Sequence, residues 1–235
     1  MMDARNMKLV LFDIDGTILW SDGAGRRAMT EALTTVFGGA GPTDYHYDGK
    51  TDPQIVRDLM RASGHTDETI DARLTPLMQR YLGGLERELA GGTRAHVFDG
   101  VRALLDELEA RSDIVLGLLT GNLREGAAIK LRAADIDIDR FTVCAFGSDH
   151  HARGELPALA QRRAKDELGL DIPGDHIFVI GDTPADVSCG RAIGARAIAV
   201  ATGRYTPEEL ARHRPYALFP SLADTQAVMR VIIDA

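Results

Sequence analysis

The 235-residue chain has little of what marks secreted, disulfide-rich or membrane-spanning proteins. It contains two cysteines, Cys144 and Cys189, which predicts buried free thiols and excludes a disulfide framework. No apolar run approaches the roughly 18 residues that a membrane-spanning helix needs. Residues 1–6 form no apolar leader before the first predicted strand. We therefore expect a soluble, cytoplasmic protein that does not associate with membranes.

Basic residues are also scarce relative to acidic ones. The chain has 27 Lys and Arg against 35 Asp and Glu, a formal net charge of -8. This balance argues against a nucleic-acid-binding surface. An acidic protein can still bind an anionic substrate, because a bound metal ion and a few local cations dominate the field at a site. With 45% hydrophobic residues, the chain can build a sizeable core and a second small domain.

The most informative segment is residues 8–17. Residues 8–12 (KLVLF) predict a strand buried on both faces, and two carboxylates, Asp13 and Asp15, follow directly. Desolvated carboxylates repel each other, and a divalent cation would remove that cost. One carboxylate could then act as a nucleophile while its neighbour transfers protons. The alternative is an ordinary turn, since Asp and Gly are common turn residues.

Three further apolar runs repeat this layout. Residues 114–119 lead into Thr-Gly-Asn at 120–122, residues 141–146 lead toward Asp149, and residues 177–180 lead into GDTPAD at 181–186. A strand, a polar turn and a helix in repetition indicate a doubly wound, mostly parallel α/β sheet. Such sheets bind ligands beyond the carboxyl ends of their strands, so these polar segments are expected to converge on one crevice.

Residues 20–92 differ in character and predict an all-helical cap inserted after the first strand. Helical periodicity covers residues 23–37, 52–62 and 66–89, the last either as one helix or as two that separate at Pro76. We expect Asp52 to cap the second of these helices, and Ser221 to cap the last helix of the chain. Residues 1–19 and 93–235 would then form the α/β core. The two crossings, near residues 20–22 and 91–93, would act as hinges.

The chain resembles the haloacid dehalogenase-like (HAD) superfamily, in particular its phosphoglycolate-phosphatase-like branch with a helical cap. Residues 13–17 resemble the first HAD motif, residues 120–122 the second and residues 181–186 the fourth, in the same order and spacing. The resemblance covers nearly the whole chain. It implies a HAD Rossmann-like core and phosphoryl transfer, which the second carboxylate of the first motif also favours over dehalogenation.

The resemblance implies a role for each carboxylate. Asp13 would attack phosphorus and form an aspartyl-phosphate. Asp15 would protonate the leaving oxygen and then deprotonate the attacking water. Asp13, the backbone carbonyl of Asp15 and Asp182 would hold Mg²⁺, and Asp186 would orient these groups. The remaining substrate- and phosphate-binding candidates are Thr17, Thr120, Gly121, Asn122 and Lys50.

The third motif departs from the family pattern. The family has a Lys next to a Pro at this place, whereas residues 148–157 contain no Lys. Arg153 is the nearest cation, and its fork suits a phosphoryl group. Lys165 would lie about 15 Å further along the helix, away from the crevice. In the cap, Lys50 either reaches the substrate or belongs to an ordinary helix start.

We therefore expect a Mg²⁺-dependent phosphatase of small phosphomonoesters, either phosphoglycolate-like molecules or sugar or nucleotide phosphates. One alternative is a phosphomutase or phosphonate hydrolase on the same scaffold. A phosphonate hydrolase of this family needs a Schiff-base Lys in the cap, where Lys50 is the one Lys present. Another alternative is a non-catalytic metabolite-binding protein. The expected partner is a small phosphorylated metabolite, and the expected assembly is a monomer or a homodimer.

Overall fold

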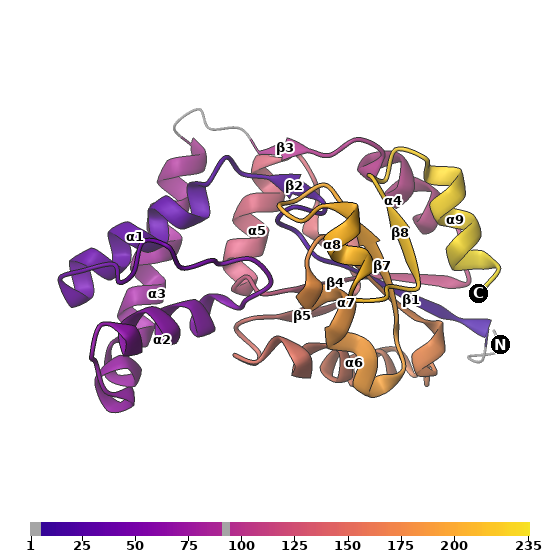
Figure 1. Cartoon of the computed structure of the whole chain (residues 1–235). Helices are drawn as coiled ribbons and strands as arrows, with labels where there is room; N and C mark the ends of the chain where they lie inside the picture. Colours follow the sequence, from indigo (N-terminus) through magenta and orange to yellow (C-terminus); the bar gives the residue numbers. More distant parts are fainter. Residues whose placement is uncertain (1–5, 91–94) are drawn as a thin grey trace.

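The computed structural model describes residues 6–90 and 95–235. Within these residues it contains a six-stranded parallel sheet in the order β5-β4-β1-β6-β7-β8 (Figure 1). The strands are β1 (Lys8–Phe12), β4 (Ile114–Thr120), β5 (Val143–Phe146), β6 (Ile177–Gly181), β7 (Arg196–Val200) and β8 (Ala217–Phe219). This sheet confirms the predicted α/β fold class.

Strand β1 lies inside the sheet, and all five of its residues are buried. It pairs in parallel with β4 on one side and with β6 on the other, so that Phe12 lies opposite both Leu118 and Ile180. The chain order reverses here, since β4 and β6 flank β1 on opposite sides. The carboxyl ends of the three strands therefore meet at one edge, where doubly wound sheets bind their ligands.

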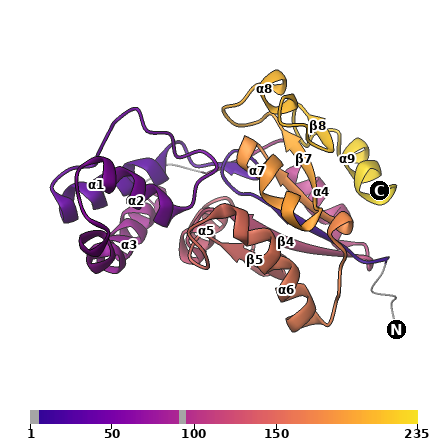
Figure 2. The same ribbon diagram turned by 60° about the horizontal axis from the view of Figure 1, so that its bottom comes forward.

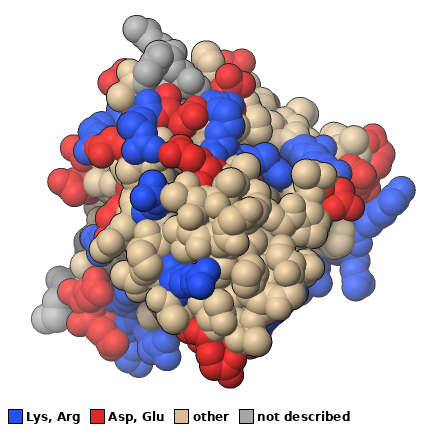
Figure 3. All heavy atoms as spheres, turned by 90° about the vertical axis from the view of Figure 1, so that its left-hand side faces the viewer, with Lys and Arg blue, Asp and Glu red and all other residues tan. Residues whose placement is uncertain are grey.

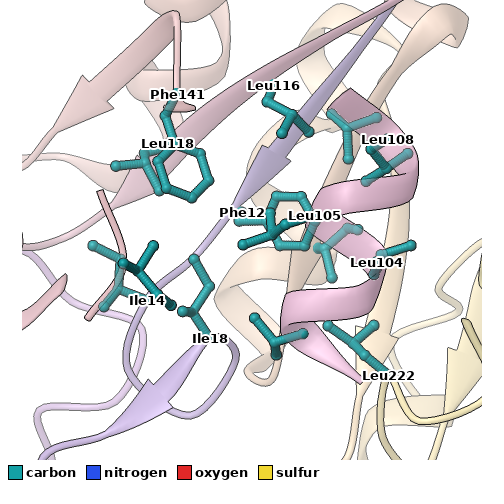
Figure 4. Packing of buried hydrophobic residues seen from close by; sticks show 14 of the residues in the cluster. Phe12, Ile14, Ile18, Leu104, Leu105, Leu108, Leu116, Leu118, Phe141 and Leu222 are labelled. Carbon is teal, nitrogen blue, oxygen red and sulfur yellow. The ribbon is translucent and has the colours of Figure 1, made fainter. Parts of the chain in front are cut away.

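Helices cover both faces of the sheet (Figures 1 and 2). One face, which carries Val10 and Phe12, packs against α4, α5 and α9, and Figure 4 shows part of this core. The other face, which carries Leu9 and Leu11, packs against α6. The helices of the core are α4 (Val101–Glu109), α5 (Arg124–Ala133), α6 (Leu156–Leu168), α7 (Pro184–Cys189), α8 (Pro207–Ala211) and α9 (Thr225–Ile233).

Three helices that lie between β2 and β3 in the chain form a separate unit, seen at the left of Figures 1 and 2. Its helices are α1 (Ala24–Phe37), α2 (Asp52–Ala62) and α3 (Asp67–Ala90), and they share a hydrophobic core that includes Met29, Leu59 and Tyr81. This unit is the predicted helical cap, although its exact limits stay a prediction.

A short antiparallel ribbon links the cap to the sheet. Strand β2 (Leu19–Trp20) pairs with β3 (His96–Val97). The first crossing then turns through Asp22 and Gly23, which both have left-handed backbone conformations with φ of 49° and 74°. The second predicted crossing, residues 91–93, lies outside the described residues.

Of the two alternatives for residues 66–89, the structure has the single helix: α3 continues through Pro76 without interruption, because the buried residues on either side of it pack against the cap core. Two local predictions were wrong. Thr51, rather than Asp52, caps α2, with its hydroxyl accepting from the Gln54 amide at 3.2 Å. Asp224, rather than Ser221, caps α9, because its carboxylate lies closer to the first helical turn and accepts from the Ala227 amide at 3.0 Å.

Among residues 6–90 and 95–235, no helix combines the length and apolar character needed to cross a bilayer. Figure 3 shows the face of the molecule on the side of the cap. Acidic and basic side chains lie close together along its upper edge, and uncharged residues form much of the rest. Charges of both signs are thus interspersed on this face.

Candidate active site

Three buried aspartates meet at the carboxyl edge of the sheet. Asp13 follows β1, Asp182 follows β6, and Asp186 lies in the first turn of α7. One carboxylate oxygen from each lies within 4.8 Å of the others. Burial raises the pKa of Asp13 from 3.8 to about 6. Burial, followed by repulsion from Asp186 and Asp13, raises the pKa of Asp182 well above its ordinary value.

Arg153 supplies a cation beside this cluster. It begins the short 3₁₀ helix Arg153–Glu155 that leads into α6, and it is 6% exposed. Its Nη2 lies 3.2 Å from Asp13 Oδ2, pairs with Asp186 and also donates to the Leu119 carbonyl at 3.3 Å. Burial lowers the pKa of Arg153, but the two carboxylates raise it further, so the guanidinium stays charged. The side chain predicted to replace the family's Lys therefore lies between Asp13 and Asp186.

One donor of Arg153 is unused. Its Nε is buried and has no hydrogen-bond partner among the residues that the structure describes. A buried polar group without a partner is costly, and an anion bound at the site would satisfy such a donor. The catalytic role of Arg153 stays a prediction, but its position and its free donor suit a phosphoryl group.

The donor set at this edge fits a divalent cation. Three buried carboxylates face one guanidinium, so full ionisation leaves two uncompensated negative charges. Both oxygens of Asp186 are engaged, one by Arg153 and one by Thr183, which leaves Asp13 and Asp182 to ligate a metal ion. Oxygen ligands few in number are those that Mg²⁺ uses, with waters completing its shell.

Neighbouring groups fix the orientation of Asp182. Thr17, which is buried, donates its hydroxyl to Asp182 Oδ1 at 3.1 Å. Backbone presses against the same carboxylate, because a Cβ on Gly16 or Gly203 would lie 2.3 or 1.7 Å from Asp182 Oδ2. Thr17 thus contacts an aspartate in this structure, and its predicted phosphate contact stays a prediction.

The segment at 120–122 links β4 to Asp15. The Thr120 hydroxyl oxygen accepts from the Asn122 amide at 3.3 Å and from its Nδ2 at 2.8 Å. Nδ2 of Asn122 also donates to Asp15 Oδ2 at 2.8 Å. The proton of the Thr120 hydroxyl remains available to a ligand. Asn122 thus contacts Asp15 in this structure, and the predicted phosphate contacts of Thr120, Gly121 and Asn122 stay predictions.

Sequence reasoning missed Lys130, which lies in α5. Its Nζ is 2.6 Å from Asp15 Oδ2 and 2.7 Å from Asn122 Oδ1, and the residue is 4% exposed. A signal was present in the sequence, because Lys130 is a charged residue on the apolar helix face that includes Ala127 and Leu131. Its partners could not be found from spacing, since Asp15 is 115 residues away.

Sequence reasoning also missed how the cap meets the core. The backbone amide of Asp52, the first residue of α2, donates to the Gly121 carbonyl at 2.8 Å. Its carboxylate accepts from the Leu123 amide at 2.9 Å. The Thr51 hydroxyl donates to the His151 carbonyl at 2.6 Å. These hydrogen bonds seat the start of α2 against the loop that carries the predicted phosphate-binding residues.

A cavity of about 960 Å³ lies between the cap and the core. Core residues around it include Asp13, Asp15, Thr120 and Arg153, and its cap residues include Lys50. The Lys50 Nζ lies 3.6 Å from Asp58 and 3.7 Å from the centre of the Tyr45 ring. Lys50 therefore lines the cavity while its ammonium group pairs with cap residues, and its predicted contact with the substrate stays a prediction.

Comparison with known proteins agrees with this geometry. A family model described as haloacid dehalogenase-like hydrolase matches residues 7–194. The chain is 27% identical over 220 residues to N-acetylmuramic acid 6-phosphate phosphatase of Pseudomonas aeruginosa, covering 90% of this chain and 89% of that protein. It is 29% identical over 228 residues to phosphoglycolate phosphatase of Rhodospirillum rubrum, covering 92% and 88%.

Solved structures share the fold. A hydrolase from Pseudomonas syringae is similar with a TM-score of 0.74 at 22% identity, covering 96% of this chain and 99% of that one. CbbY from Rhodobacter sphaeroides in complex with phosphate is similar with a TM-score of 0.71 at 19% identity, covering 93% and 96%. At these identities the likeness establishes the architecture alone.

Proposed function

The chain belongs to the haloacid dehalogenase-like hydrolases and hydrolyses phosphoric monoesters, and we propose that it is a Mg²⁺-dependent phosphatase of small phosphorylated metabolites. The observation that carries this proposal is the convergence of Asp13, Asp182 and Asp186 on one another beside Arg153. This group opens onto a cavity that also contains Asp15 and Thr120. The residues proposed as nucleophile, proton donor and phosphate-binding groups thus line one space.

The reaction that suits these groups has two steps. In the first, an Asp13 oxygen attacks phosphorus, the ester P–O bond breaks, and Asp15 gives its proton to the leaving oxygen. In the second, Asp15 takes a proton from water, which attacks the phosphorus of the aspartyl-phosphate. Asp13 is then released as a carboxylate, and inorganic phosphate leaves. Asp15 suits proton exchange with the cavity because its side chain is 36% exposed.

Negative charge that develops on the phosphoryl oxygens needs fixed positive groups. Arg153 would supply a full charge, and the Thr120 hydroxyl and Gly121 amide would supply hydrogen bonds. Asp13, the carbonyl of Asp15 and Asp182 would hold Mg²⁺. When bound, the ion neutralises the carboxylates and withdraws charge from the phosphoryl oxygens.

The cavity supports leaving groups larger than a two-carbon acid. Its volume of about 960 Å³ lies at the upper end of the range for small-molecule sites. Tyr47, Trp20 and Phe98 contribute aromatic surface, and Arg26 and Arg204 contribute positive charge. A sugar or nucleotide phosphate suits this lining, and phosphoglycolate also fits within the space.

A phosphate-release assay over a panel of monoesters tests the proposal. The panel combines 2-phosphoglycolate, amino-sugar phosphates, hexose phosphates and nucleoside monophosphates, each with Mg²⁺ or with excess chelator. We expect release of inorganic phosphate from at least one ester, loss of turnover in chelator and recovery with Mg²⁺. Full activity in chelator would contradict the metal assignment. Transfer of the phosphoryl group to a sugar, without release of phosphate, would indicate a mutase.

Two carboxylate variants test the assigned steps. Asp13→Asn removes the nucleophile and is expected to abolish both turnover and covalent labelling by phosphate. Asp15→Asn keeps the nucleophile but removes proton transfer, which is typically worth about 10²–10⁴-fold in rate. Circular dichroism confirms folding of each variant. Near-normal turnover by either folded variant would refute its assignment.

A further inference from the structure

Lys130 is a buried cation whose side chain points at the proposed proton donor. Its Nζ donates to Asp15 Oδ2 at 2.6 Å and to Asn122 Oδ1 at 2.7 Å. Only 5% of its side chain is exposed, and a buried Lys is costly unless its charge is paired. The rigid α5 helix holds its backbone, so the ammonium group has a fixed place in the cavity wall.

The contacts around Lys130 fix one oxygen of Asp15. Oδ2 accepts from Lys130 and also from Asn122 Nδ2 at 2.8 Å. Asn122 is itself anchored by the Thr120 hydroxyl at 2.8 Å. No hydrogen bond within residues 6–90 and 95–235 uses the Oδ1 atom of Asp15. Two donors therefore orient the carboxylate by one oxygen and leave the other oxygen for the substrate.

The ammonium group also lies against the cap. A Cβ on Gly25 of α1 would lie 3.5 Å from Lys130 Nζ, and the Tyr81 hydroxyl lies on the same side of Gly25, at 3.8 Å from that Cβ position. The Lys130 charge also acts on the buried Asp52 carboxylate. Burial raises the pKa of Asp52, the nearby Lys130 opposes this increase, and the resulting pKa is about 6. Lys130 thus stands where the cap meets the core, beside the residue proposed to transfer protons.

We propose that Lys130 is a positioning residue that holds the Asp15 carboxylate in the orientation needed to protonate the leaving oxygen, an inference that rests on the proposed phosphatase function. The effect of Lys130 on the rate should then depend on how much the leaving group needs a proton. An alkoxide is a poor leaving group and needs Asp15 to donate a proton as the P–O bond breaks. A p-nitrophenolate leaves readily without one. Loss of Lys130 should therefore harm alkyl esters more than aryl esters.

The test measures single-turnover cleavage of p-nitrophenyl phosphate and of the best alkyl monoester from the panel. We expect Lys130→Met to slow alkyl ester cleavage by about 10²-fold, the loss typical of a misplaced catalytic group. Cleavage of the aryl ester should slow less than about 10-fold. Lys130→Arg should recover part of the alkyl rate, because the charge and the donors return. Lys130→Ala also removes the donor and carries the same comparison if the Met variant does not fold.

Lys165→Met is the matched control, since Lys165 is exposed on α6 and pairs with Asp171. It should cleave both esters at the wild-type rate. An equal loss on both esters in folded Lys130 variants would overturn the proposal and indicate a structural role. Unchanged rates on both would overturn it as well. If wild-type protein cleaves neither ester, the proposed phosphatase function itself fails, which is a separate outcome.

Discussion

Arg153 balances part of the charge of the aspartate cluster, and its surroundings suit the prediction that it takes the place of the family's Lys. It is buried, it pairs with Asp13 and Asp186, and its Nε has no hydrogen-bond partner among the described residues. Lys165, the competing cation, lies on the exposed surface of α6 and pairs with Asp171. At the scale of single residues, burial and carboxylate partners therefore favour Arg153 over Lys165 as the predicted cation of the third motif.

Replacement of Arg153 tests this assignment. We expect Arg153→Ala to lower kcat by about 10²-fold, as for removal of one preorganised stabilising donor. Arg153→Lys should recover part of the loss, because it restores the charge without the fork. Steady-state kinetics with the best panel substrate measure the effect, and Lys165→Ala is the control with unchanged kcat. A loss in the Lys165 variant that matches the Arg153 variant would contradict the assignment.

At the scale of elements, the start of α2 is pressed against two loops of the core. Gly49 has a left-handed backbone with φ of 71°, and a Cβ there would lie 2.6 Å from Ala185 Cβ and 2.9 Å from Thr183 Oγ1. The Thr51 hydroxyl donates to the carbonyl of His151, and the Asp52 amide donates to the carbonyl of Gly121. Close approach at Gly49 therefore brings the cap loop and Lys50 to the cavity.

A pair of glycine variants separates this contact from backbone strain. Gly64 also has a left-handed backbone, with φ of 86°, but a Cβ there would meet nothing within 4 Å. Gly64→Ala should therefore cost only the strain of the left-handed conformation, about 1–2 kcal/mol of unfolding free energy, and keep kcat/KM. Gly49→Ala adds the clash with α7 and should lower kcat/KM by about 10-fold or more. Denaturant titration and steady-state kinetics measure both, and equal kcat/KM in the two variants would refute the role of the contact.

At the scale of the whole molecule, the candidate site buries more negative charge than its neighbouring cation balances. Burial raises the pKa of Asp13 to about 6 and that of Asp182 well above 3.8. The folded protein thus binds these protons more tightly than the unfolded chain does. For Asp13, the resulting contribution to stability is full below about pH 3.8 and is lost as the pH rises through about 6. A divalent ion competes with these protons and restores the balance.

Thermal unfolding in chelator and in Mg²⁺ tests this coupling. We expect Mg²⁺ to raise Tm by about 5 °C at about pH 7.5, where Asp13 is ionised, when its concentration is about 100 times Kd. The increase should be smaller at about pH 5, where protons occupy the site. Asp13→Asn should reduce the effect of Mg²⁺ at pH 7.5, and sodium at matched ionic strength should not reproduce it. An equal Mg²⁺ effect at both pH values in the wild type would contradict the coupling.

The sequence by itself determined the α/β class, the helical insertion and the segments that supply the candidate site. Each candidate aspartate follows a buried strand or begins the next helix, and such signals lie within about ten consecutive residues. The burial of β1 on both faces followed from its apolar run. Because parallel strands align their carboxyl ends, these local signals were enough to predict that Asp13 and Asp182 lie close together.

Tertiary structure alone decided the contacts between distant segments. Lys130 meets Asp15 across 115 residues and Asp52 meets Leu123 across 71, and no local pattern encodes either pair. Packing kept α3 continuous through Pro76, and side-chain geometry chose Asp224 over Ser221 as the last helix cap. The physical reason is that burial and ion pairing depend on which surfaces the folded chain brings together, whereas strand and turn preferences act between neighbours along it.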